Sequence, residues 1–120
     1  MRGVTLWLLT IVSAAMFLLA GTLKLAGVQM EVDLFAAVGI GQWFRYFTGL
    51  LEVGGAIGLF VPAVASYAAL LLATVMVGAV TTHLVIIGGN PLVPMLLVGA
   101  TLTIAWLRRQ QISSLRAVIA

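Results

Sequence analysis

Four long apolar segments constrain what this chain can fold into. They cover about residues 4–26, 42–61, 63–87 and 92–107. Each approaches the roughly 20 residues that an α-helix needs to cross the hydrocarbon core of a bilayer, although the fourth is short. Of the 120 residues, 63% are hydrophobic and 8% are charged, an apolar share well above that of typical soluble domains. The sequence therefore predicts an all-α, integral membrane four-helix bundle that forms a single domain over residues 1–120.

The connections between these segments carry turn signals. Pro62 separates the second segment from the third, and Gly-Gly-Asn-Pro at 88–91 separates the third from the fourth. Proline disfavours helix at the residue before it, and glycine and proline together favour turns. These connections are short, so consecutive helices are expected to be neighbours.

The connection after the first segment is longer and has a pattern of its own. Apolar residues recur there at nearly helical spacing, at Val32, Leu34, Phe35 and Val38. This pattern favours a short helix that lies in the membrane interface or dips into the mouth of the bundle. Whether its two acids, Glu31 and Asp33, close over the bundle is left open by the sequence.

Basic residues predict the orientation. With four crossings, both ends of the chain lie on one side, and four arginines fall there: Arg2, Arg108, Arg109 and Arg116. The positive-inside rule places that side in the cytoplasm, and Trp7, Trp43 and Trp106 fall at the expected boundaries. Arg2 ahead of an apolar stretch also resembles a signal peptide, but residues 4–23 are long enough to span and are expected to be a retained helix. We expect a multi-pass protein of a bacterial inner membrane.

Composition excludes several kinds of chemistry. The chain has no cysteine, which removes disulfides, thiolate metal sites and thiol nucleophiles. Its single histidine does not make a metal site, so no metal is expected. Six basic residues without interleaved aromatics do not form a nucleic-acid surface, and the expected surrounding is the lipid bilayer.

Glu52 is the residue that most needs an explanation. A charged side chain at the centre of a bilayer costs about 2.5 to 3.5 kcal/mol even on insertion scales, so it needs a partner or a function. Helix side chains lean toward the N-terminus, which tilts Glu52 toward the outer surface. Lys24, Arg45 and His83 are predicted to reach the same outer half from the first, second and third segments. We therefore expect an outward-facing polar pocket.

The predicted ligand-binding residues are Lys24, Arg45, Thr48, Glu52, Met76 and His83. Each also has a purely structural interpretation. Lys24 can extend to the headgroups, Arg45 can anchor the outer interface, and His83 can bond a backbone carbonyl or Thr48. A buried pair of Glu52 with Arg45 can also fix the helix register without any chemistry.

Around these residues, the sequence resembles those of the DoxX-like family of small four-helix membrane proteins. The resemblance rests on G-x-x-K-L at 21–25, on R-x-x-T-G-L-L-E-V-G-G-A-I-G-L at 45–59 followed by Pro62, and on M-x-x-A-x-x-x-H at 76–83. It implies a four-helix bundle similar to that of vitamin K epoxide reductase, here without that enzyme's cysteines. Relatives are described as membrane components of oxidoreductase systems, one of them linked to thiosulfate:quinone oxidoreductase.

Three functions remain open at this stage. The first is an accessory or quinone-binding component of a membrane oxidoreductase, with no covalently or thiolate-bound cofactor, quinone as the ligand and redox centres on a partner. The second is a cofactor-free acid–base enzyme, such as an isomerase, cyclase or epoxide-opening enzyme, with Glu52 and His83 as catalytic residues. The third is a structural partner or assembly factor. A stripe of small residues at Gly54 and Gly58 is the expected contact for another membrane protein or a second copy.

Overall fold

The computed structural model describes residues 2–109, and every regular element in that range is a helix. The elements, in chain order, are α1 (Arg2–Ala26), α2 (Gln29–Val38), α3 (Gln42–Gly58), α4 (Ala65–Thr82), the short π-helix η1 (His83–Ile87) and α5 (Leu92–Leu107). The all-helical prediction is confirmed for these residues. A helix also forms in the connection where the sequence predicted one, as α2.

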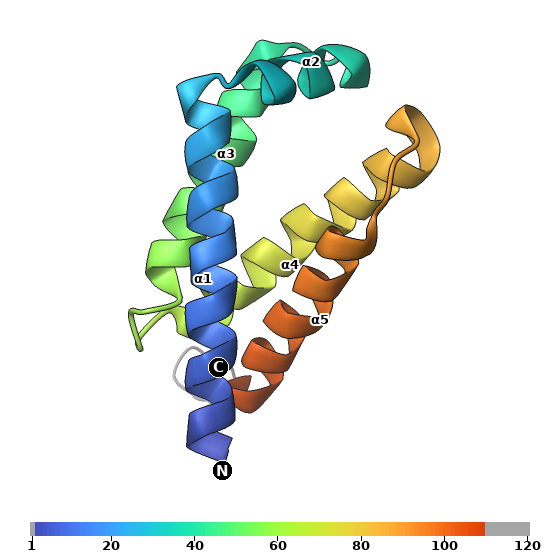
Figure 1. Ribbon diagram of the computed structural model, residues 1–120. Coiled ribbons are helices and arrows are strands. Elements are labelled where there is room, and N and C mark those ends of the chain that lie inside the picture. The colour runs from blue at the N-terminus through green and yellow to red at the C-terminus, as the bar shows by residue number, and fades with distance from the viewer. Residues whose placement is uncertain (1, 110–120) are drawn as a thin grey trace, which may run out of the picture.

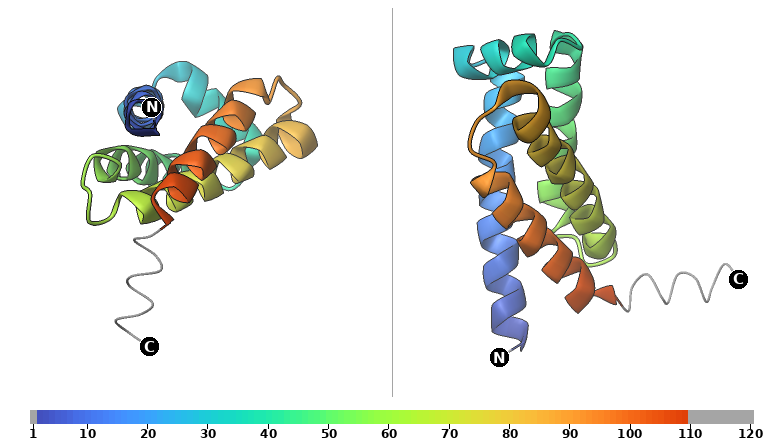
Figure 2. Two further views of the ribbon diagram at one scale, coloured as in Figure 1. Left: turned by 90° about the horizontal axis from the view of Figure 1, so that it is seen from below. Right: turned by 90° about the vertical axis from the view of Figure 1, so that its right-hand side faces the viewer.

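The long helices form two pairs that spread apart like a wedge. In Figure 1, α1 lies beside α3 and α4 beside α5, and the pairs diverge toward the end where α2 lies. Figure 2 shows that α2 lies across the ends of α1 and α3. The wide end of the wedge is therefore bordered by α2 and by the helix ends that α2 connects, the end of α1 and the start of α3.

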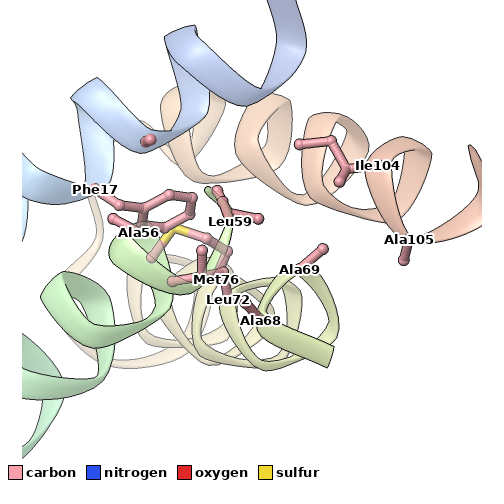
Figure 3. Packing of buried hydrophobic residues seen from close by; sticks show 10 residues of the cluster. Phe17, Ala56, Leu59, Ala68, Ala69, Leu72, Met76, Ile104 and Ala105 are labelled. Atoms are coloured by element: carbon pink, nitrogen blue, oxygen red, sulfur yellow. The ribbon is translucent and has the colours of Figure 1, made fainter. Parts of the chain in front are cut away.

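A core of small and medium-sized side chains fills the narrow part of the wedge. Phe17 of α1, Leu72 of α4 and Ile104 of α5 are fully buried there, and Ala56 of α3 packs among them (Figure 3). Alanine at this position and at Ala69 lets the helix backbones approach closely. The core therefore fixes the angle between the two helix pairs.

Glycines allow α1 and α3 to pack with almost no space between them. A Cβ atom on Gly21 would lie 2.7 Å from Val53 Cγ2 and 2.9 Å from the Gly49 carbonyl oxygen. A Cβ atom on Gly49 would lie 3.1 Å from both the Gly21 carbonyl oxygen and Lys24 Cβ. Side chains larger than hydrogen would push these helices apart, so the two glycines set the separation of α1 and α3.

The observed helix bounds differ from the expected ones around the second connection. The helix predicted to reach residue 61 ends at Gly58, and the next begins at Ala65 rather than at residue 63. Backbone bonds of turn type, from Phe60 N to Ile57 O and from Val64 N to Val61 O, fill the interval around Pro62. The third predicted helix is also not uniform, because it changes from α to π geometry at His83.

Within the part of the chain that the structure describes, two helical stretches are long and apolar enough to cross a membrane, 3–26 and 65–87. Helix α3 has 17 residues and α5 has 16, which correspond to about 26 and 24 Å of helix. A crossing by these two helices, and the cytoplasmic position of both ends, stay predictions. Arg116, one of the four arginines behind that orientation, lies outside the described residues.

The stripe of Gly54 and Gly58 does not form one free surface. A Cβ atom on Gly58 would lie 2.9 Å from Ala68 Cβ, so this glycine serves the packing of α3 against α4 within the chain. Gly54 has no atom within 4 Å of its Cβ position. The prediction that both glycines dock a partner is therefore corrected at Gly58, which has an intramolecular role.

We expect Gly21→Ala to destabilise the protein by about 1 to 3 kcal/mol, because the new methyl group overpacks the contact of α1 with α3. Gly54→Ala is the matched control: it adds the same methyl group to open space, where alanine favours the helix. Thermal unfolding in detergent, followed by circular dichroism, measures both. Equal midpoints for the two variants would contradict the close glycine contact.

Candidate functional site

A pocket of about 540 Å³ occupies the wide end of the wedge. Helices α1 to α5 and η1 all contribute residues to its lining, which is predominantly apolar. Its volume lies in the range typical of sites for small molecules. Five of the six predicted ligand-binding residues line this pocket, and they are Lys24, Thr48, Glu52, Met76 and His83.

A buried ion pair joins α1 to α3 at the wall of the pocket. Lys24 Nζ lies 2.8 Å from Glu52 Oε1, and the Glu52 side chain is fully buried. Gly49 lies one turn before Glu52, and a Cβ atom on it would lie 3.1 Å from Lys24 Cβ, so the glycine packing of the two helices brings the ammonium to the carboxylate. The second carboxylate oxygen, Oε2, has no hydrogen-bond partner among residues 2–109.

Glu31 joins this pair from α2. Its Oε1 lies 3.9 Å from Lys24 Nζ, and its Oε2 is buried without a hydrogen-bond partner in the described part of the chain. Sequence reasoning left the role of this acid open. The available signal was its place in the first turn of a short helix, where a carboxylate is favoured by the helix dipole. Asp33, by contrast, is exposed and accepts a hydrogen bond from Gln29 at 2.7 Å.

Arg45 does not contact Glu52, and the structure places it outside the pocket lining. Its guanidinium donates to the Lys24 carbonyl oxygen and, at 2.7 Å, to Gln42 Oε1. Gly27 follows α1 in a left-handed conformation (φ 72°), which favours glycine over residues with a side chain. Arg45 therefore caps the carbonyl end of α1, where a cation is favourable. The alternative of a Glu52 and Arg45 ion pair is wrong, because Lys24 is the partner.

His83 stands where α4 changes into η1. Its Nδ1 lies 2.8 Å from the carbonyl oxygen of Ala79, one of the structural roles open to it from the sequence. The hydroxyl of Thr48 donates to its own helix, to Phe44 O at 2.8 Å, and not to His83. Single π-helical turns inside helices are frequent at functional sites.

Aromatic side chains form one side of the pocket. Phe35 of α2 meets Phe44 of α3 edge to face, with ring centroids 5.8 Å apart, and Phe44 stacks on Phe47 at 6.3 Å. All three rings belong to the pocket lining. Helix α2 is held over this wall by Gln42 Nε2, which donates to Val32 O at 3.0 Å. The lining of the site thus combines aromatic rings with charged side chains.

Lys24→Met should destabilise the protein by about 3 to 5 kcal/mol, because it leaves the Glu52 carboxylate buried without a counter-charge. The double variant Lys24→Met/Glu52→Leu should recover most of that loss. Unfolding in detergent measures the whole double-mutant cycle, and Asp33→Asn is the control for an exposed acid. A Lys24→Met variant within about 0.5 kcal/mol of the wild type would show that the pair carries little stability.

Comparison with known proteins supports the pattern found in the sequence. Among residues 2–109, no group of three histidine, cysteine or acidic side chains is placed to hold a metal ion. We find no match among curated proteins and none among solved structures. The model of the DoxX-like family matches residues 8–108, which include every residue that lines the pocket. The chain therefore belongs to the DoxX-like family.

Proposed function

We propose that this protein binds the head group of a lipid-soluble molecule of the quinone class, as an accessory component of a membrane oxidoreductase system. The observation that carries the proposal is the pocket of about 540 Å³, which is apolar except for Lys24, Glu31, Glu52 and His83 and a few threonine hydroxyls. An apolar cavity with a few convergent polar groups is the usual form of a small-molecule site.

The aromatic wall favours a ring-shaped head group. Phe35, Phe44 and Phe47 offer edges and faces at the separations that aromatic rings prefer for one another. Lys24, Glu31 and Glu52 belong to the same lining, so a ring with oxygen substituents can contact both aromatic and polar side chains. A fully aliphatic ligand would leave Oε2 of Glu31 and Oε2 of Glu52 without hydrogen-bond donors.

Redox centres are expected on a partner protein. The chain has no cysteine and a single histidine, too few ligands for an iron–sulfur cluster or a haem with two histidine ligands. The pocket would then hold a lipid-soluble electron carrier while the partner exchanges electrons with it. A homo-oligomer through the exposed Gly54 remains compatible with this role.

The proposed setting is the inner membrane, with four crossings, both chain ends in the cytoplasm and the pocket in the outer half. Support comes from Arg108 and Arg109, which follow α5, the helix whose C-terminal end lies opposite α2 (Figure 1). The two shorter helices would match the bilayer by local thinning or through the turns that extend them.

Filling the pocket should abolish binding. Gly78 lines the pocket and has no atom within 4 Å of its Cβ position, so Gly78→Phe places a ring in the cavity without displacing a packed neighbour. Gly99→Phe is the matched control, because Gly99 is as open but lies outside the lining. In lipid nanodiscs, a radiolabelled decyl-substituted hydroquinone, kept anaerobic, should bind saturably to the wild type and to Gly99→Phe. Binding to Gly78→Phe should be at least about tenfold weaker, and equal binding to all three proteins would contradict the proposal.

Acid–base catalysis is a second candidate, favoured by one observation. Glu52 and His83 line the same cavity, so a carboxyl group and an imidazole could act on one lipophilic substrate. The purified chain alone should then open a long-chain epoxide, and Glu52→Gln and His83→Ala should each abolish the conversion. No conversion at stoichiometric enzyme would count against this candidate and leave the binding role unaffected.

A further inference from the structure

We propose that the pocket selects head groups that donate hydrogen bonds, so that it binds a hydroquinone in preference to the corresponding quinone. A hydroquinone carries two O–H donors, whereas a quinone presents two carbonyl oxygens that only accept. The inference rests on the proposed function and adds which form of the ligand the site recognises. It follows from the hydrogen-bonding groups of the lining residues that have no partner within the described part of the chain.

Two acceptor oxygens of the lining residues receive no hydrogen bond from the described part of the chain. Oε2 of Glu52 and Oε2 of Glu31 are both buried and have no hydrogen-bond partner among the described residues. A buried acceptor left unpaired costs free energy, so a ligand that donates to these oxygens gains more than one that cannot. Both oxygens belong to carboxylates, whose hydrogen bonds are stronger than those of neutral acceptors.

The side-chain donors of the lining already have acceptors. The lining contains three threonines, each of which donates its hydroxyl to a carbonyl oxygen four residues earlier in its own helix. These bonds run from Thr48 to Phe44 O at 2.8 Å, from Thr74 to Leu70 O at 2.9 Å and from Thr82 to Gly78 O at 2.8 Å. Their oxygens can still accept, but their hydrogens are used.

His83 also offers an acceptor. Its Nδ1 lies 2.8 Å from Ala79 O, and a carbonyl oxygen only accepts, so Nδ1 carries the proton. In the neutral imidazole the other nitrogen, Nε2, is then an acceptor. No partner for Nε2 is found within residues 2–109. Toward a ligand, His83 therefore offers an acceptor and not a donor.

Lys24 is the remaining donor, and two carboxylates share it. Its ammonium lies 2.8 Å from Glu52 Oε1 and 3.9 Å from Glu31 Oε1. One cation between two acids leaves this side of the pocket negative, which disfavours the electron-rich oxygens of a quinone. A second cation would neutralise the second acid, but Arg45 donates to the Lys24 carbonyl oxygen at the end of α1 instead.

Three ligands that share a ring and a decyl chain separate donor recognition from shape: the benzoquinone, its hydroquinone and the dimethyl ether of that hydroquinone. The ether keeps both oxygens and loses both O–H donors. Each is measured by anaerobic equilibrium binding to the full chain in nanodiscs. We expect the hydroquinone to bind at least about tenfold more tightly than either of the others.

Variants test whether the carboxylates cause the preference. Glu52→Gln replaces acceptor oxygens by an amide that also donates, and it should bring the ratio of hydroquinone to quinone affinity close to one. Glu31→Gln should lower the ratio in the same direction, which keeps the test available if Glu52→Gln does not fold. Asp33→Asn, on the exposed side of α2, should leave the ratio unchanged.

Two results would overturn the inference, and only one of them would also remove the proposed function. Saturable binding of all three ligands with similar affinity would leave a quinone-class pocket and remove the donor preference. Absence of saturable binding for every ligand would remove the proposed function, and this inference with it.

Discussion

The buried ion pair between Lys24 and Glu52 is the interaction on which the rest of the site depends. It exists because Gly21 and Gly49 let α1 and α3 touch, which brings the ammonium within 2.8 Å of the carboxylate. Arg45 then secures the end of α1 just beyond Lys24, and Glu31 reaches the same ammonium from α2. One contact thus connects the helix packing, the position of α2 and the polarity of the pocket.

This arrangement joins two interpretations of Glu52 that at first compete. As a structural element, the carboxylate holds α1 and α3 in register through Oε1. As part of a site, its Oε2 is buried without a hydrogen-bond partner among the described residues, and Glu52 lines a cavity of about 540 Å³. Buried ion pairs contribute stability only when their remaining hydrogen bonds are satisfied. The free oxygen therefore argues for a ligand in addition to a structural role.

Sequence reasoning predicted the helices and most of the polar set, because hydrophobic periodicity and the cost of charge in lipid both act locally. It placed Lys24, Glu52 and His83 in one cluster, and all three line the pocket. It named Arg45 as the partner of Glu52 in a structural ion pair, whereas the actual partner, Lys24, is set by how closely α1 approaches α3. The contribution of Glu31 depends on the fold of α2 over the wedge, a tertiary contact that spacing along the chain does not contain. The bond of His83 to the Ala79 carbonyl, four residues earlier in the same helix, is local, and the sequence offered it as one of several roles.

Photoaffinity labelling tests the central claim most directly, namely that a lipid-soluble ring binds beside the Lys24 and Glu52 pair. The probe is a hydroquinone with a diazirine next to the ring, irradiated with the protein in nanodiscs, and labelled residues are mapped by mass spectrometry. The account predicts labels on pocket residues such as Leu34, Thr48 and Met76, suppressed by excess unlabelled hydroquinone. Labels confined to the exposed outer faces of the helices, such as Leu8 and Leu96, and unaffected by competition would contradict it.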